Sequence, residues 1–326
     1  MSEKLSVIIP NYNHGHFLIE LLPSLFAQSR QPDEVVIIDD GSTNNSIEII
    51  EAFQKEEGRV RLFKNEVNKG VVFSLNFAVS QSKGDWVTFP SADNFVLPGM
   101  YEKSLRMLKQ HPQAAVCCSD PVIFHEVSGI KERRKLNLSN IPKYFSPKET
   151  VEIFAKTGFT IGSVVHTIVV KKSALQEAGL NADYFIPKLR WHCDFFALNS
   201  VAFRYGFCYI PEELSMFRES PQSYSKKPVE WKIRKKVYQD LIRVINLSKN
   251  RDIKHAFKKS AILGEFTYSM LAVLISNPFF YEYFTFRLIH NCFWTLLRKA
   301  CKIILPQAIY GLLRKILTRQ RRIKNL

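Results

Sequence analysis

Residues 85–94 have the composition of an apolar strand that stops at Pro90 and is followed by a polar loop with Asp93 and Asn94. In an α/β sheet, ligands collect beyond the carboxyl ends of the strands. A carboxylate there is suited to hold a divalent cation against a diphosphate, because Mg²⁺ needs only one or two carboxylates besides phosphate oxygens and waters. The alternative is that Asp93 caps the helix that follows.

Two earlier strands also end in polar loops. The apolar run 5–9 is followed by Pro10, Asn11, Tyr12 and Asn13, and the run 34–38 by Asp39-Asp40-Gly41-Ser42. Helical patterns separate these strands, at residues 16–28, 46–53 and 71–80, and a further strand is expected at residues 60–63. Strands alternating with helices at this spacing predict right-handed βαβ units, so three polar loops gather along one edge of a parallel sheet.

A sugar nucleotide fits this layout. The Tyr12 ring can stack on a base, Asp40 can accept a hydrogen bond from a uracil or thymine ring N–H, and Asp93 can hold the metal on the diphosphate. The alternative for Asp40 is an ordinary turn that caps a helix. The sequence has no G-x-G-x-x-G after its first strand, no P-loop and no G-x-S-x-G motif.

Four motifs in this order resemble family 2 glycosyltransferases of the GT-A fold. The resemblance covers about residues 4–226 and rests on residues 6–13, 38–43, Asn68-Lys69-Gly70 and the Asp93 loop. It implies a Rossmann-like, mostly parallel sheet flanked by helices, a nucleotide-sugar donor, a divalent metal (Mg²⁺ or Mn²⁺) and inversion at the anomeric carbon. The residues that it places at the donor are Pro10, Tyr12, Asn13, Asp40, Lys69, Ser91 and Ala92, with Asp93 on the metal.

The resemblance also extends to the second half of the chain. Asp194 lies where the family has the acidic motif that supplies the general base, and it is the only acid between Asp183 and Glu212. The alternatives are that Asp194 caps the following helix and that His192 is the base. Arg218 lies where the family has an arginine near the diphosphate, although it can equally be a surface residue.

The match has three departures. Ser91 replaces the first acid of the family's metal motif, Ser74-Leu75-Asn76 replaces a common Ala-Arg-Asn, and Cys193 stands where a second acid is common. Between the two halves, an apolar strand containing His166 is expected at residues 164–170, and a histidine in such a strand is more often a core residue than a catalyst.

The chain changes character after residue 226. Residues 228–326 hold 20 Lys or Arg against five acids, which accounts for almost all of the net charge of +16. Long helices are expected at residues 230–246 and 254–276, and a basic amphipathic helix at 309–317. Such a composition suits the surface of an anionic membrane. The alternative is a helical bundle that covers the catalytic domain or forms a dimer. No nucleic-acid-reading motif is found.

The sequence therefore predicts a glycosyltransferase domain at residues 1–226 and a helical, basic, membrane-associating extension at 227–326. The expected reaction moves a sugar from a nucleoside diphosphate to a hydroxyl of a lipid-linked or polysaccharide acceptor, at the inner face of the cell membrane, in cell-envelope or polysaccharide biosynthesis. Six cysteines without metal spacing, and an N-terminus without a signal-peptide pattern, favour the cytoplasm. The alternatives are a degenerate donor-binding membrane subunit and a nucleotidyltransferase.

Overall fold

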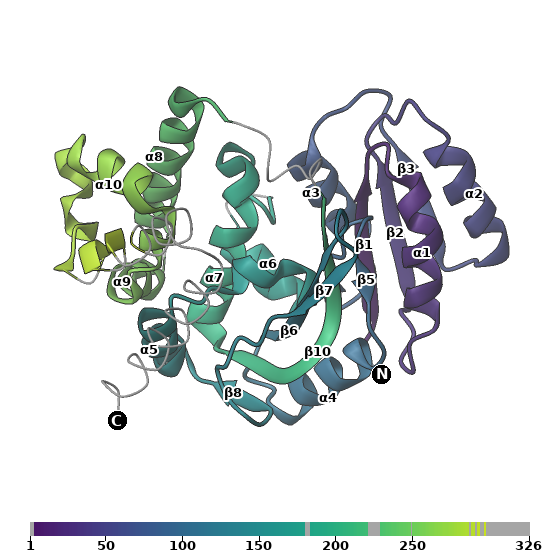
Figure 1. The fold of residues 1–326 in the computed structure, drawn as a ribbon, viewed down its shortest axis with the longest axis horizontal. Coiled ribbons are helices and arrows are strands. Elements are labelled where there is room, and N and C mark those ends of the chain that lie inside the picture. The colour runs from purple at the N-terminus through teal and green to yellow at the C-terminus, as the bar shows by residue number, and fades with distance from the viewer. Residues whose placement is uncertain are drawn as a thin grey trace.

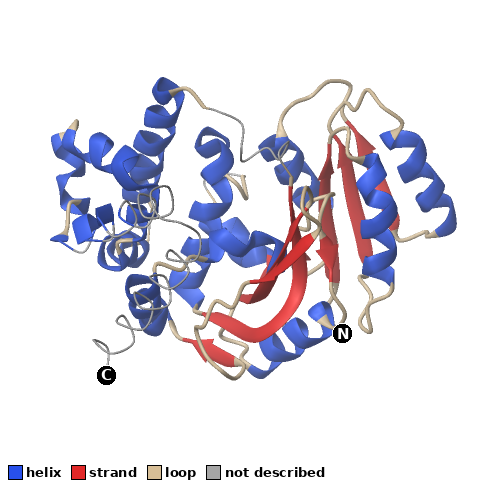
Figure 2. Cartoon of the chain, in the orientation of Figure 1, coloured by secondary structure: helices blue, strands red, loops and turns tan. Residues whose placement is uncertain are grey.

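The protein is built around one central sheet with helices on both faces (Figures 1 and 2). The computed structural model describes residues 3–179, 183–220, 229–248, 250–286, 288–290, 292, 293 and 297. Within these ranges the strands are β1 (Leu5–Asn11), β2 (Glu34–Asp39), β3 (Val60–Lys64), β4 (Trp86–Thr88), β5 (Phe95–Val96), β6 (Val116–His125), β7 (Ile130–Arg133), β8 (Lys143–Phe145), β9 (Val169–Lys171) and β10 (Phe207–Glu219).

The α-helices of the same ranges are α1 (Gly15–Phe26), α2 (Ser46–Glu56), α3 (Val71–Gln81), α4 (Met100–Gln110), α5 (Pro147–Thr157), α6 (Lys172–Ala178), α7 (Cys193–Tyr205), α8 (Trp231–Leu247), α9 (Arg251–Ser260) and α10 (Thr267–Ile275). The 3₁₀ helices are η1 (Ile161–Thr167), η2 (Pro187–His192), η4 (Ile262–Phe266) and η5 (Pro278–Tyr283).

The sheet confirms the predicted fold class. Its strand order is β3-β2-β1-β4-β9-β6-β10-β5, with β7 beside β6 and β8 beside β10. The first four strands of this order are parallel to one another, β9 is antiparallel to both β4 and β6, and β6 and β10 form another parallel pair. Because β2, β1 and β4 are adjacent and parallel, the loops that follow them leave the sheet at the same edge, as the sequence predicts.

Alternating side chains of β1 face two hydrophobic cores. Leu5, Val7 and Ile9 pack in the core that includes the buried leucines of α1, whereas Ile8 packs with residues of α3 and α7 on the other face. A strand buried on both faces needs a continuous apolar run, which is why residues 5–9 are apolar without alternation.

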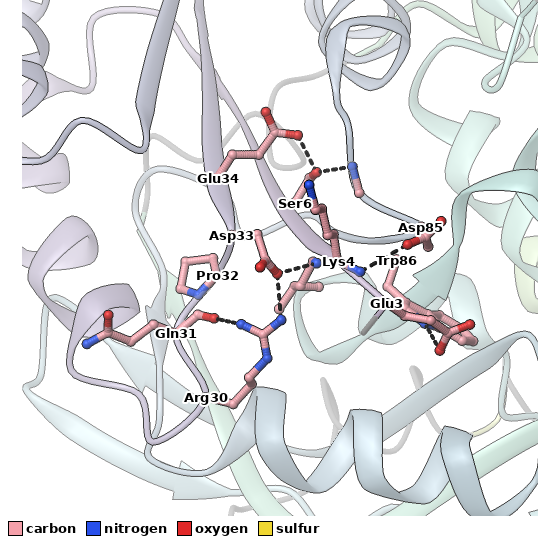
Figure 3. A network of polar contacts seen from close by, with 12 residues as sticks. Glu3, Lys4, Ser6, Arg30, Gln31, Pro32, Asp33, Glu34, Asp85 and Trp86 are labelled. Atoms are coloured by element: carbon pink, nitrogen blue, oxygen red, sulfur yellow. Dashed lines mark hydrogen bonds and ion pairs between the residues drawn. The ribbon is translucent and has the colours of Figure 1, made fainter. Parts of the chain in front are cut away.

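The opposite edge of the sheet is closed by polar contacts that join β1, β2 and β4 (Figure 3). The Ser6 hydroxyl donates to the Glu34 carboxylate at 2.6 Å and accepts from the Gly84 amide at 2.8 Å. A side chain at Gly84 does not fit, because a Cβ atom there would lie 2.5 Å from Ser6 Oγ. These contacts fix the strands relative to one another at their amino ends and leave the carboxyl ends for the site.

Two expected elements are different in the structure. Residues 161–167 form the 3₁₀ helix η1 and only β9 is extended, so the prediction of a strand at 164–170 is wrong for most of its length. The helix expected at 254–276 is broken, because Ala261 adopts a left-handed conformation (φ +53°) and separates α9 from η4 and α10. The amphipathic helix expected at 309–317 lies outside the described residues.

The described part of the extension packs on the part of the chain that precedes residue 226. In Figure 1, α7 lies between the sheet and helices α8–α10. The Phe257 ring of α9 stacks on Phe196 of α7 at a centroid distance of 5.9 Å and contacts Phe203 edge-on at 5.1 Å. Phe257 therefore belongs to the same hydrophobic core as residues of α7 and of the sheet. The boundary at residue 226 stays a prediction.

Candidate functional site

The loops after β1 and β2 are joined by a buried hydrogen-bond network. The Asp39 carboxylate accepts from the Asn11 side-chain amide at 2.7 Å, from the Ser42 backbone amide at 2.8 Å and from the Ser42 hydroxyl at 2.6 Å. Ser42 Oγ in turn accepts from the Asn13 amide at 2.8 Å. Asp39 therefore holds the two loops in one arrangement, and it is fully buried.

Asp40 organises a third segment, the loop between β3 and α3. Its carboxylate is buried and accepts from the Asn65 side chain at 2.8 Å and from the amides of Lys69 and Gly70 at 2.9 Å each. Gly41 lets this loop approach, since a Cβ atom there would lie 2.8 Å from the Val67 carbonyl carbon. A carboxylate has about four acceptor positions, so Asp40 keeps one for a ligand donor, and base binding by Asp40 stays a prediction.

The other residues expected at the donor lie around these loops. Pro10, the next-to-last residue of β1, is partly exposed, and Tyr12 is 43% exposed, which leaves it available for stacking. Asn13 has a left-handed backbone (φ +59°), and its side-chain oxygen accepts from the Thr43 amide at 2.8 Å. Lys69 is exposed, with its ammonium group 4.8 Å from the centre of the Phe73 ring.

The Asp93 loop is a tight turn, in which the Asn94 amide donates to the Ser91 carbonyl at 3.0 Å. Ser91 is exposed, Ala92 is buried and Asp93 is half-buried. Burial raises the pKa of Asp93, while His14 and Arg218 act in the opposite direction through their positive charge and Glu126 adds to the rise. A half-buried carboxylate with too little positive charge around it suits a cation, which would stabilise its ionised form.

Arg218 fixes this loop from β10. It is buried, and its Nε donates to the Asp93 carbonyl at 3.1 Å, while Nη2 pairs with Glu20 at 2.7 Å and Nη1 with Glu126 at 3.4 Å. Its guanidinium also lies against the rings of Phe17, Phe95 and Phe124. The alternative of a surface arginine is therefore wrong, and phosphate binding by Arg218 stays a prediction.

Asp194 lies in the first turn of α7, one residue after the helix begins. Its Oδ1 accepts from the Phe195 amide at 2.6 Å, so the carboxylate does satisfy one free N–H of the helix, although His192 occupies the N-cap position. Burial raises the pKa of Asp194 to about 6, against the hydrogen bond from Phe195. A general base works best when its pKa lies near the operating pH, so this environment suits a base as well as a cap.

His192 lies in an aromatic cluster. Its ring is 4.4 Å from the centre of Phe266 and stacks on Tyr238 at 5.4 Å, and burial lowers its pKa to about 4. A histidine in this setting is a weaker base than Asp194. His166 is similar, because it is buried beside Phe217, and burial lowers its pKa to about 4.

Phe185 joins the segment that leads to Asp194 to the strand that leads to the Asp93 loop. Its amide donates to the Asn76 side chain at 2.8 Å, and its carbonyl accepts from the same side chain at 2.7 Å. Its ring meets Phe89, which directly precedes Pro90, at a centroid distance of 5.4 Å. In the sequence, Asn76 stands out only as part of the tripeptide Ser74-Leu75-Asn76, which differs from the family's. The structure shows that Asn76 anchors the segment leading to η2 and α7.

Sequence reasoning also missed Glu265, in η4. Its Oε2 accepts from the Thr160 hydroxyl at 3.4 Å, and it lies close enough to Asp194 for the two charges to interact. The only sequence signal was that Glu265 is one of five acids in a strongly basic stretch.

In the ranges that the structure describes, no group of three or more His, Cys, Asp or Glu side chains is placed to hold a metal ion. A divalent ion at Asp93 would thus depend on ligand oxygens and waters for most of its coordination. Of the helices in these ranges, none combines the length and apolar character needed to cross a bilayer.

Comparison with known proteins was made by sequence and by structure. The family model for Glycosyl transferase family 2 matches residues 6–177. Glycosyltransferase GlyG of Streptococcus pneumoniae serotype 4 is 36% identical over 110 residues, which cover 34% of this chain and 36% of that protein. An uncharacterized glycosyltransferase of Haemophilus influenzae is 27% identical over 190 residues, 56% of this chain and 67% of that protein. The chain therefore spans little more than a third of the length of GlyG.

Solved structures share the fold. Residues 1–349 of TarS from S. aureus, in complex with UDP-GlcNAc, superpose with a TM-score of 0.62 at 20% identity, covering 84% of this chain and 73% of that one. The mannosyltransferase PcManGT from Pyrobaculum calidifontis, in complex with GDP-Man and Mn²⁺, gives a TM-score of 0.54 at 15% identity, covering 98% and 80%. The fold agrees with these neighbours and the family model covers more than half of the sequence, so the chain belongs to glycosyl transferase family 2.

Proposed function

We propose that the protein is an inverting glycosyltransferase that moves a sugar from a nucleoside diphosphate to a hydroxyl group of a lipid-linked or polysaccharide acceptor. The observation that carries this proposal is the joining of the loops after β1, β2 and β3 by Asp39 and Asp40, beside the Asp93 loop that follows β4. The structural neighbours in complex with UDP-GlcNAc and GDP-Man support a sugar nucleotide as donor.

In the proposed reaction, Asp194 takes the proton of the acceptor hydroxyl. The acceptor oxygen then forms a bond to the anomeric carbon, and the bond between that carbon and the diphosphate breaks with its electron pair leaving on the diphosphate. Asp93 is the residue that would hold a divalent metal, which supplies positive charge to the diphosphate when bound. The Tyr12 ring and Asp40 are proposed to bind the base, and Lys69 and Arg218 to lie near the phosphates.

A melting screen with nucleotide sugars tests the donor class. Intact protein is heated with UDP-N-acetylglucosamine or GDP-mannose, each with Mg²⁺, Mn²⁺ or chelator, and hydrolysis of the donor is followed separately. A donor that raises the melting temperature and is hydrolysed supports the enzyme. Binding without hydrolysis or transfer would favour the degenerate donor-binding subunit, and uptake of a nucleoside triphosphate with release of pyrophosphate would favour a nucleotidyltransferase.

We further propose that the protein associates with the inner face of the cell membrane through the extension. Several apolar side chains of the described extension are exposed, and Phe279 and Phe286 are 86% and 84% exposed. Aromatic side chains beside a strongly basic stretch are typical of interfacial segments. Helix α9 also packs on α7. A membrane role of the extension is therefore compatible with the alternative that the extension packs on the first 226 residues.

Arg218→Met separates a structural role from donor binding. Removing the guanidinium leaves the Asp93 carbonyl without its donor and Glu20 and Glu126 without their shared cation, so we expect the free energy of unfolding to fall by about 1–3 kcal/mol. The exposed Arg133→Met, which loses an ion pair with Glu213, is the control and should change it by less than about 0.5 kcal/mol. Chemical denaturation measures both. An Arg218→Met protein of normal stability that fails to bind donor would instead assign this residue to the phosphates.

Asp93→Asn should abolish metal-dependent donor binding, because it removes the carboxylate of the loop. Turnover should fall by about 10²–10³, the usual effect of losing one strong electrostatic contact in an active site. Donor titrations with and without Mn²⁺ measure the binding, with Glu56→Gln, at an exposed acid at the end of α2, as the control. Near-normal activity of Asp93→Asn at saturating metal would contradict the assignment.

Asp194→Asn should bind donor normally and turn over about 10² times more slowly, the usual contribution of a general base. In the unchanged protein, the rate of donor hydrolysis should fall below about pH 6, because protonation of Asp194 removes the base. If Asp194 only caps α7, Asp194→Asn should lower the free energy of unfolding by about 1 kcal/mol and keep its activity. If that is the outcome, His192 becomes the residue to test.

The double variant Phe279→Ser/Phe286→Ser should sediment less with vesicles of anionic phosphatidylglycerol than the unchanged protein does. Binding of the unchanged protein should also weaken at high salt, since surface charges are screened within about 8 Å at physiological ionic strength. Val127→Ser is the control, because Val127 is 82% exposed but lies between β6 and β7, outside the extension. Equal sedimentation of all three proteins, or none with the unchanged protein, would argue against a membrane surface at these aromatic residues.

A further inference from the structure

Glu265 reaches the site from the extension, more than 70 residues beyond Asp194 in the sequence. Its neighbour Phe266 fixes η4 against the start of α7, with its ring centre 4.4 Å from that of His192 and 4.9 Å from that of Phe195. His192 and Phe195 lie on either side of Asp194 in the sequence. Phe266, the last residue of η4, therefore holds this end of η4 against the first turn of α7.

A second set of contacts leads to the same place. The Thr160 hydroxyl donates to Glu265 Oε2 at 3.4 Å, and the amide of the next residue, Ile161, donates to Asn199 of α7 at 3.1 Å. Gly162 lies directly on the backbone of Phe195, since a Cβ atom there would be 2.7 Å from Phe195 Cα. Glu265 is therefore held beside the first turn of α7 by two independent routes.

The charges around Glu265 are not balanced. Within the described residues Glu265 forms no ion pair, although its side chain remains accessible to solvent. Partial burial raises the pKa of Glu265 to about 7, the Thr160 hydrogen bond and the charge of Arg134 oppose this rise, and repulsion from Asp194 makes a smaller contribution to it. His192, the other titratable group beside Asp194, is neutral near pH 7 because its pKa is about 4.

We propose that Glu265 and Asp194 act as a carboxyl pair, in which Asp194 takes the proton of the acceptor hydroxyl and the neighbouring Glu265 carboxylate makes it a stronger base. The inference rests on the proposed role of Asp194. When the proton moves to Asp194, the acceptor O–H bond breaks and its electron pair stays on the oxygen, which bonds to the anomeric carbon as the bond from that carbon to the diphosphate breaks and its electron pair leaves on the diphosphate. The charge of the carboxyl pair thereby changes from −2 to −1. Proton transfer therefore relieves a repulsion between two carboxylates. Glu265 is a positioning residue that acts through Asp194, and it makes the extension part of the reacting site.

Glu265→Gln in the intact protein tests this, with Glu282→Gln as the control. Glu282 lies in the same extension, where it pairs with Lys254 at 2.9 Å, so both variants remove one negative charge from it. Water is the acceptor used, because it is the smallest hydroxyl acceptor, and the donor is the one selected by the melting screen. The hydrolysis rate is measured between pH 5 and 9. We expect the rate of the unchanged protein to rise through about pH 7 as Glu265 ionises, and Glu265→Gln to lack this rise and be about tenfold slower at pH 8.

A second measurement needs no substrate. Because the pKa of Glu265 is raised, the stability that its protonated form contributes is present at low pH and lost as the pH rises through about 7. The melting temperature should therefore fall less between pH 5.5 and 8.5 in Glu265→Gln, and also in Asp194→Asn, than in Glu282→Gln. A merely structural role of Glu265 would lower it equally at both pH values.

The outcomes separate this inference from the proposed function. Hydrolysis and melting profiles of Glu265→Gln that match those of Glu282→Gln would overturn the carboxyl pair. Full hydrolysis by Asp194→Asn would instead overturn the base assignment, and with it the catalytic part of the inference, while the melting comparison would still show whether the two carboxyl groups interact.

Discussion

Burying a carboxylate is unfavourable unless hydrogen bonds or cations compensate for the lost water, and this constraint divides the acids of the site into two groups. Asp39 and Asp40 are buried and accept three hydrogen bonds each from neighbouring loops. Their negative charge is used to hold the loops that follow β1, β2 and β3, so these two residues give the donor side its shape.

The second group is less well compensated. Burial raises the pKa of Asp93, Asp194 and Glu265. Such carboxyl groups are favoured where a ligand, a metal or a proton completes the site during function. The division follows the proposed roles, because the acids with three hydrogen bonds each shape the donor loops and the others are proposed to take part in the chemistry.

The two sides of the site depend on a few close contacts. Asn76 and Phe89 both hold Phe185, so the segment that leads to Asp194 is fixed against the strand that leads to Asp93. Gly162 has the same effect on the other side, where only a residue without a side chain lets η1 lie on the backbone of Phe195. Cores packed at this density transmit small displacements, so substitutions at these positions are expected to move both carboxylates relative to each other.

The parts of the fold that the sequence predicted correctly are those encoded by local patterns. Continuous apolar runs gave the buried strands β1 and β2, and the polar residues after them gave the loops at the sheet edge. The strand expected at 164–170 was wrong because β-branched residues favour strands only where the packing agrees. There, the hydroxyls of Ser163 and Thr167 donate to carbonyls three residues earlier and stabilise a 3₁₀ helix.

Glu265 could not be predicted for a different reason, since its role depends on a tertiary contact between the extension and α7. The left-handed Ala261 redirects the chain from α9 into η4, and Phe266 then places η4 on His192 and Phe195. A helix continuing through Ala261 would not make this turn. The same segment that brings Glu265 to the site leads on to the exposed Phe279 and Phe286. A membrane that binds these rings would thus act on the chain only about 15–20 residues from the proposed carboxyl pair, so that one short segment would connect the proposed membrane surface with the proposed base.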